Sequence, residues 1–177
     1  PNTVLWVDSQ FVRKSSNGGR TWADAVSRVV NTNWRSRGID NVVPIVVEPS
    51  AADPNLVYAG YMDMGLWRTD DGGASWKSLN VPQYSGGWSD AVGGNTLSVL
   101  ADPSRADVVW AQVGGNLENC NNPCEEPMYL LKSTNRGANW TQLSTGLPNP
   151  IRRLEGLSLV PTSSATSRRL YVVANGD

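Results

Sequence analysis

The stretch that decides the fold is Thr69-Asp-Asp-Gly-Gly-Ala-Ser-Trp76, because the chain contains it three times. The other copies are Ser15-Ser-Asn-Gly-Gly-Arg-Thr-Trp22 and Ser133-Thr-Asn-Arg-Gly-Ala-Asn-Trp140. All three read Ser/Thr-x-Asp/Asn-x-Gly-x-polar-Trp. A segment that returns at such intervals, with a glycine turn between two apolar runs, is typical of a β-propeller blade.

Each position of the repeat has a physical role. Asp or Asn at the third position accepts hydrogen bonds from backbone N–H groups just ahead and closes a turn. Glycine at the fifth tolerates a positive φ, and tryptophan at the eighth re-enters the sheet and is expected to be largely buried between blades. The structural positions of the three copies are Ser15, Asn17, Gly19 and Trp22; Thr69, Asp71, Gly73 and Trp76; and Ser133, Asn135, Gly137 and Trp140.

These segments resemble the Asp-box, or BNR repeat, of sialidases, xyloglucanase-type glycoside hydrolases and sortilin-type receptors. The resemblance implies that the three boxes are staples on one face of a propeller and that any ligand binds the opposite face. The Arg-Ile-Pro signature that a sialidase has near its first blade is missing, so a sialidase is poorly supported.

The runs around the boxes predict thirteen strands in an all-β propeller segment of four-stranded antiparallel blades. Residues 42–80 and 96–145 are two complete blades, and 1–30 and 152–177 are two partial blades. Because a propeller needs four to eight blades to close, we expect the chain to be part of a larger disc. The predicted strands are 3–8, 11–15, 22–26, 42–48, 56–62, 65–69, 76–79, 96–101, 108–113, 128–133, 140–143, 154–160 and 169–174.

Composition limits the chemistry. Fifteen basic and sixteen acidic residues give a net charge of −1, which does not favour nucleic acid as a partner. No apolar run approaches the ~20 residues of a membrane span. The chain has no histidine, so neither a metal site nor a cofactor is expected, and hydrolysis would depend on carboxylates, tyrosine or arginine.

A start at Pro1 indicates a processed, trimmed or partial chain.

The two cysteines lie in Cys120-Asn-Asn-Pro-Cys124. A disulfide here would stiffen a short loop and favours an extracellular or periplasmic protein, either secreted or on the cell surface. Two free thiols, or half of a metal site, are the alternatives.

Aromatic side chains in the long loops are candidates for ligand binding. Trp34, Tyr84, Trp88 and Asp90 fall in connections expected on the face opposite the boxes, together with the cysteine loop. Rings stack on the apolar face of a sugar while Asp bonds its hydroxyl groups. The alternative is that Trp34 and Trp88 fold back and plug the disc.

Asp63 is the candidate catalytic residue. Its surroundings, Tyr58-Ala-Gly-Tyr-Met-Asp63-Met-Gly65, are similar to a xyloglucanase segment in which Tyr-Ala, two residues and Asp precede a glycine turn. In this chain one more residue separates Ala from Asp. The resemblance implies a catalytic carboxylate, whereas the alternative is an Asp that closes a tight turn.

Two functions follow from these features. One is an extracellular propeller that binds glycan or protein on its loop face, with the rest of the same propeller as a further partner. The alternative is a secreted glycoside hydrolase, xyloglucanase-like, that acts on a polysaccharide through carboxylates. Asp-box repeats occur in both classes, so the repeat itself does not choose between them.

Overall fold

The computed structural model of the chain describes residues 2–7, 12–36, 43–62, 64–81, 94–114, 127–151, 153–160 and 164–175. Every regular element within these ranges is a β-strand, and the paired strands run antiparallel. The described part of the chain holds no helix with the length and apolarity that crossing a bilayer requires. The predicted all-β class is confirmed.

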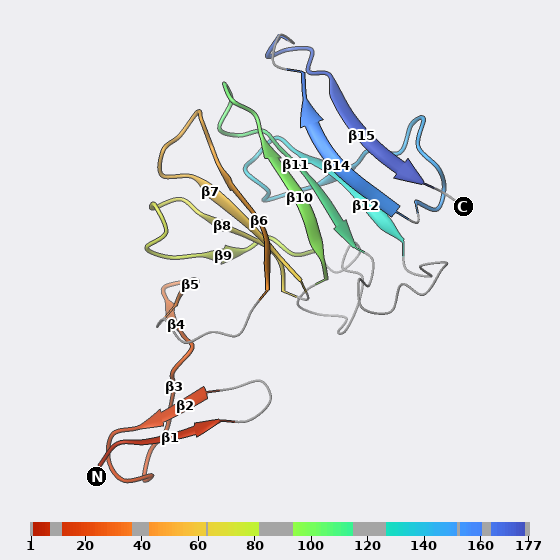
Figure 1. Cartoon of the computed structure of the whole chain (residues 1–177). Helices are drawn as coiled ribbons and strands as arrows, with labels where there is room; N and C mark the ends of the chain where they lie inside the picture. Colours follow the sequence, from red (N-terminus) through yellow and green to blue (C-terminus); the bar gives the residue numbers. More distant parts are fainter. Residues whose placement is uncertain are drawn as a thin grey trace.

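Two four-stranded sheets form the centre of the molecule (Figure 1). The first consists of β6 (Pro44–Pro49), β7 (Val57–Tyr61), β8 (Gly65–Thr69) and β9 (Lys77–Ser78). The second consists of β10 (Thr96–Ala101), β11 (Val109–Gly114), β12 (Met128–Ser133) and β13 (Thr141–Gln142). A pair, β14 (Arg153–Leu159) and β15 (Leu170–Asn175), follows.

The strand positions agree closely with the sequence prediction. β8, β10 and β12 have the predicted bounds, and each remaining predicted strand differs by one or two residues at its ends. In both complete sheets the strands follow one another in chain order. This up-and-down meander is the architecture of a propeller blade.

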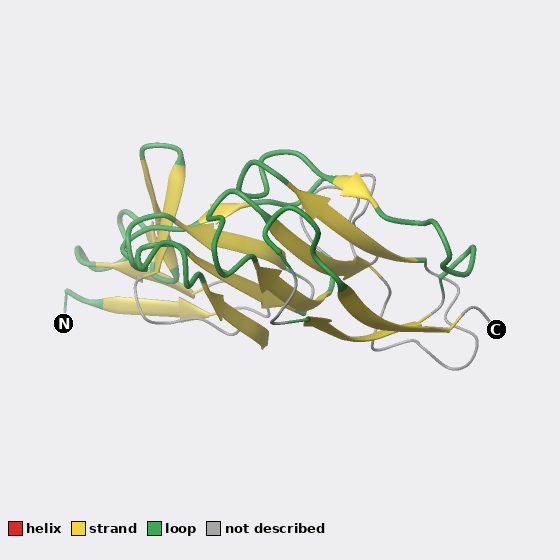
Figure 2. Cartoon of the chain, turned by 90° about the horizontal axis from the view of Figure 1, so that it is seen from above, coloured by secondary structure: helices red, strands yellow, loops and turns green. Residues whose placement is uncertain are grey.

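The sheets lie next to one another through their first strands. β10 contacts β6, β7 and β14, and Figure 1 shows the three sheets one after another. In Figure 2 the described part of the chain consists of strands and loops. Apolar residues at alternate strand positions face the neighbouring sheet, as the strand period requires. The order of layers is therefore that of consecutive blades.

Two apolar cores hold these layers together. The core between the two four-stranded sheets contains Leu56, Tyr58, Leu66, Leu79, Val99, Ala101, Val109 and Ala111, with Trp140 packed against it. The core between the second sheet and the β14–β15 pair contains Met128, Leu130, Ile151 and Leu154. Burial of such side chains supplies most of the stabilisation between neighbouring sheets.

The three repeated turns share one hydrogen-bond pattern, with the hydroxyl of the first residue at its centre. In the second turn, Thr69 Oγ1 accepts from the N–H groups of Asp71 (3.2 Å) and Gly73 (2.9 Å) and donates to Asp71 Oδ1 (2.7 Å). Asp71 Oδ1 then accepts the N–H of Ser75 at 2.8 Å. Ser15 and Ser133 form the corresponding bonds in the other two turns.

The second and third turns lie side by side at the same end of their sheets. Arg136 Nη1 of the third turn lies 3.3 Å from Asp70 of the second and 3.2 Å from Asp53 of the first sheet. Arg68 in turn donates to the backbone carbonyl of Arg136. This end of the strands is called the turn end below, and the opposite end is called the loop end.

The N-terminal sheet departs from the expected packing. It contains β1 (Val4–Val7), β2 (Val12–Ser15) and β3 (Ala23–Asp24) and lies apart from the layered sheets in Figure 1. Trp22 is 41% exposed, whereas Trp76 and Trp140 are partly buried. The prediction that all three tryptophans are largely buried is wrong for Trp22, because among the described strands no sheet packs over its ring.

A hairpin was not predicted at all. β4 (Ser27–Val30) pairs with β5 (Asn33–Ser36) through a two-residue turn that begins at Asn31, which has φ 58°. The sequence predicted no strand between residues 26 and 42. A two-residue link in which asparagine takes a positive φ is a usual hairpin turn, so Asn31-Thr32 was the available signal.

Candidate functional site

The connection between β7 and β8 carries the candidate catalytic position. Position 63 itself lies outside the described residues, but both of its neighbours are described. The N–H of Met64 donates to the carbonyl oxygen of Met62 at 2.7 Å, and Tyr61 pairs directly with Gly65. β7 and β8 are thus joined by a short connection at the loop end.

Two side chains hold this connection in place. The carbonyl oxygen of Met64 accepts from Trp67 Nε1 and from Asn80 Nδ2, each at 2.9 Å. Asn80 Oδ1 accepts the N–H of Leu66 at 2.8 Å. The amide of Asn80 therefore holds the connection on both sides of Gly65, at Met64 and at Leu66.

Gly65 is required by this arrangement. Its φ is 70°, a conformation that side chains with a Cβ rarely adopt. A Cβ at this position would also overlap the amide oxygen of Asn80. Sequence reasoning recognised the glycine turn but missed Asn80, because that residue is 14 positions away from its partner Leu66 and belongs to no local pattern.

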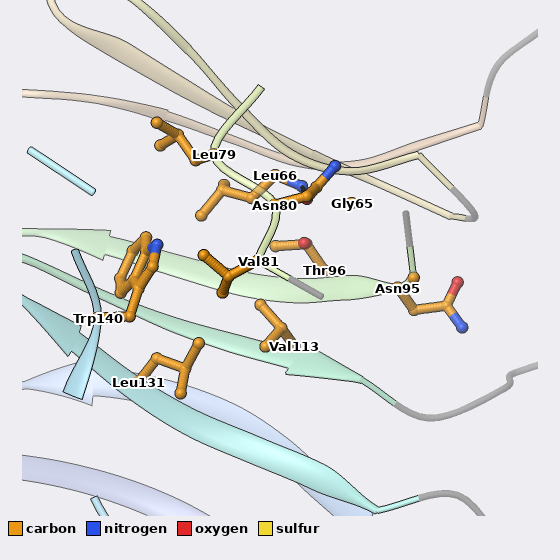
Figure 3. Close-up of a pocket in the computed structure, with 11 residues that line it drawn as sticks. Gly65, Leu66, Leu79, Asn80, Val81, Asn95, Thr96, Val113, Leu131 and Trp140 are labelled. Carbon is orange, nitrogen blue, oxygen red and sulfur yellow. Dashed lines mark hydrogen bonds between the residues drawn. The ribbon is translucent and has the colours of Figure 1, made fainter. Parts of the chain in front are cut away.

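A small cavity lies directly beneath the connection (Figure 3). Its volume is about 20 Å³, and its lining includes Gly65, Asn80, Asn95, Thr96 and Trp140. Thr96 is fully buried, and its Oγ1 has no hydrogen-bond partner among the described residues. The space suits one water molecule and is too small for a sugar ring, so the cavity belongs to the support of the loop end.

Glu48 of β6 is a half-buried carboxyl group that no sequence pattern indicated. Its Oε1 accepts the N–H of Ala101 at 3.0 Å, which ties the first sheet to the second. Desolvation by burial raises the pKa of Glu48, and the hydrogen bond from Ala101 partly offsets that shift. Glu48 pairs with Tyr58 towards the turn end, away from the Met62–Gly65 connection, so its role is structural.

The structure places Trp34 differently from the prediction. Its N–H donates to the carbonyl of Trp76 at 2.7 Å, and the N–H of Trp76 donates to Trp34 at 2.6 Å. Arg35 Nε donates to the carbonyl of Ala74 at 2.7 Å. Trp34 therefore belongs to a strand that pairs beside the second turn, and its predicted place on the opposite face is wrong.

The ring of Trp34 is 42% exposed, so it does not plug the disc. Its backbone forms the hydrogen bonds to the first sheet. The remaining candidates for a ligand site, a catalytic role or a disulfide lie outside the described residues. They are Asp63, Tyr84, Trp88, Asp90, Cys120 and Cys124.

Comparison with solved structures supports the fold. The chain is similar to an ancestral GH74 enzyme, with a TM-score of 0.55 and 23% identity over 95% of the chain. It spans 19% of the length of that enzyme. At this identity the likeness shows the propeller fold and no more.

Two further GH74 structures align less well. They are the GH74 enzyme of Niastella koreensis, with 16% identity over 83% of this chain and 28% of that one, and the GH74 xyloglucanase of Xanthomonas campestris, with 13% over 82% and 28%. Both have a TM-score of 0.27, so no argument is based on them. No protein-family model matches the sequence, and no curated protein matches it either.

Proposed function

We propose that this chain is a segment of an extracellular or periplasmic Asp-box propeller that hydrolyses a polysaccharide, with Asp63 as one of the catalytic carboxylates. The observation that carries the proposal is the bracing of the Met62–Gly65 connection by Asn80 and Trp67. A reacting carboxylate needs a fixed backbone, because small displacements cost large factors in rate. The fold likeness to an ancestral GH74 enzyme supports the same class.

The chemistry requires a second carboxyl group. Glycoside hydrolysis uses one carboxylic acid that protonates the leaving oxygen and one carboxylate that acts as base or nucleophile, at about 5–10 Å from each other. The described residues around the connection offer none, since the lining beneath it is amide, hydroxyl and apolar. The proposal therefore requires a partner carboxylate from outside the described residues, either in this chain or in another part of the protein.

The lack of a second carboxyl group among the described residues around the connection leads to a second candidate function. A propeller without an opposing carboxylate would bind a glycan or a protein on its loop face and catalyse nothing. Tyr84, Trp88 and Asp90 would then form the binding surface, and Asp63 would close a tight turn.

Replacement of Asp63 by Asn distinguishes the two functions. In an enzyme, Asp63→Asn abolishes turnover of a β-glucan such as xyloglucan and leaves its affinity nearly unchanged, because the amide has the same shape and cannot exchange a proton as a carboxyl group does. Asp107→Asn, which removes an exposed carboxylate in the turn between β10 and β11, is the matched control. Full turnover in Asp63→Asn would reject the catalytic role.

The binding surface has its own test. Trp88→Ala should weaken polysaccharide binding by about 1–3 kcal/mol, as the loss of an aromatic anchor does, with the melting temperature unchanged. Trp34→Ala serves as the control, because Trp34 contacts the first sheet through its backbone beside the second turn. If Trp88→Ala unfolds the protein while binding per folded molecule is kept, Trp88 is a core residue instead.

A further inference from the structure

A second cavity opens at the turn end, between the second sheet and the β14–β15 pair. Its volume is about 290 Å³, close to the lower size of sites that hold small organic ligands. It lies at the opposite end of the strands from the Met62–Gly65 connection, since Asp102 follows the last residue of β10. Four of its lining residues are charged, and they are Asp102, Arg105, Lys132 and Arg168.

Two of these charges neutralise each other. Arg168 donates to Asp102 with two nitrogen atoms, Nε to Oδ2 and Nη2 to Oδ1, each at 2.7 Å. The carboxylate of Asp102 is fully buried. The hydrogen bonds from Arg168 lower the pKa of Asp102 to about 2, so the pair is ionised at neutral pH and forms a rigid wall with no net charge.

The other two charges have no carboxylate partner in the described part of the chain. Arg105 Nη1 donates only to the carbonyl of Ala165, at 3.4 Å, and Arg105 Nε is buried without a hydrogen-bond partner. The ammonium of Lys132 lies 5.7 Å from the centre of the Trp110 ring. A buried guanidinium N–H without an acceptor is costly, and an anion in this cavity would supply one.

The rest of the lining combines two polar residues, Thr166 and Ser167, with apolar ones. Val108, Leu143 and Leu170 line the cavity together with Trp110, and Val108 and Trp110 are buried. The cavity thus offers two cations without a carboxylate partner among the described residues, two hydroxyl groups and a patch of hydrocarbon. A bare inorganic anion would use only the first of these features.

We propose that this cavity binds an acidic sugar, that is, a pyranose ring bearing a carboxylate. The carboxylate lies between Arg105 and Lys132, where Arg105 Nε gains its missing acceptor, and the apolar face of the ring rests against Leu143 and Leu170. The site is separate from the loop end and does not depend on whether Asp63 is catalytic.

The test is calorimetric titration of the complete protein with glucuronic acid, glucose and acetate. Glucuronic acid should bind, glucose should not, and acetate should bind at least about tenfold more weakly, because it lacks the ring. Arg105→Gln and Lys132→Gln should each reduce the affinity for glucuronic acid roughly tenfold or more, as the loss of a hydrogen bond to a charged group does. Lys77→Gln, at an exposed position of β9, is the matched control and should have no effect.

Several outcomes would overturn the proposal. They are equal binding of glucose and glucuronic acid, equal binding of acetate, no binding of any probe, or unchanged affinity in both pocket variants. If the variants fail to fold, a protection experiment on the native protein still tests the site. Bound glucuronic acid should slow acetylation of Lys132 relative to Lys77, as read by mass spectrometry, and an unchanged rate rejects the site. Asp63→Asn should leave glucuronic acid binding intact.

Discussion

At the scale of single residues, Gly65 allows a matched comparison with Gly73. Both have a positive φ, 70° and 95°, but a Cβ at Gly65 meets the Asn80 amide, whereas a Cβ at Gly73 meets nothing within 4 Å. Gly65→Ala should therefore cost about 1–3 kcal/mol more than Gly73→Ala, because it also displaces the hydrogen bonds of Asn80. Chemical denaturation measures both, and equal losses would show that Asn80 does not brace the connection.

The buried hydroxyl at the start of each turn is a second residue-scale test. Ser133 Oγ accepts two backbone N–H groups and is almost completely buried. Ser133→Ala leaves both donors without an acceptor and should lower the free energy of unfolding by about 1–3 kcal/mol, whereas Ser133→Thr should restore it, since threonine occupies this position in the second turn. A neutral Ser133→Ala would contradict the role of the hydroxyl.

These residues also show how far the sequence determines the site. The repeat predicted the third-position Asp or Asn correctly as an acceptor, since a local pattern of polar and glycine residues encodes it. The hydroxyl at the first position was visible in the repeat but received no role. Asn80 and Thr96 gave no signal, because their partners come from contacts that exist only after the sheet has formed.

At the scale of secondary-structure elements, the Asp102–Arg168 pair joins the turn after β10 to the segment that leads into β15. The pKa of Asp102 is lowered to about 2 from an ordinary value of 3.8. Its contribution to stability is therefore complete above about pH 4 and is lost as the pH falls towards 2. The size is roughly 2 kcal/mol, from about 1.4 kcal/mol per pKa unit.

Acid denaturation of Asp102→Asn measures this contribution. The variant should be less stable than the native protein at pH 6 and should lose less stability between pH 4 and pH 2. Some acid sensitivity remains, because hydrogen bonds from Ser75 and Thr69 also lower the pKa of Asp71 to about 2. If the free energy of unfolding of the two proteins changes with pH in parallel, the ion pair contributes nothing to stability.

The hairpin β4–β5 explains why one element was missed. Its residues alternate weakly between apolar and polar, and residues 27–36 were interpreted as part of a connection between the predicted strands 22–26 and 42–48. β5 pairs along its whole length with β4, and Trp34 adds one bridge to Trp76. The hairpin therefore depends on its two-residue turn, which the sequence interpretation overlooked.

At the scale of the whole molecule, apolar side chains remain on the outer sheets. Val47 on β6 is 60% exposed, and Tyr171 and Val173 on β15 are 72% and 64% exposed. We expect these rows to be covered by further sheets of the same propeller, because uncovered apolar strands favour association. The chain expressed alone should therefore self-associate.

Light scattering of designed variants tests this expectation. The triple variant Val47→Thr, Tyr171→Thr and Val173→Thr should reduce self-association of the isolated chain with little change in stability. Val109→Thr, at a fully buried position, is the control and should lower stability without improving solubility. Persistent association of the triple variant would place the contact elsewhere.

The fold was predictable at this scale because the repeat sets the number and order of strands, and the strands of both complete sheets follow it. The packing of the N-terminal sheet was not, since the exposure of Trp22 depends on which neighbouring layer is present. The extra blades and the domain limits 1–30, 42–80, 96–145 and 152–177 stay predictions.

The way neighbouring sheets meet has a mechanical consequence. Within each sheet the strands are joined by ladders of backbone hydrogen bonds, whereas β6 and β10 meet through side chains and the single bond from Ala101 N–H to Glu48. A force that shears the strands of one sheet must break many hydrogen bonds at once. A force that peels one sheet from the next breaks the side-chain contacts between them one after another. The molecule should therefore be stiff along its strands and weak between its layers.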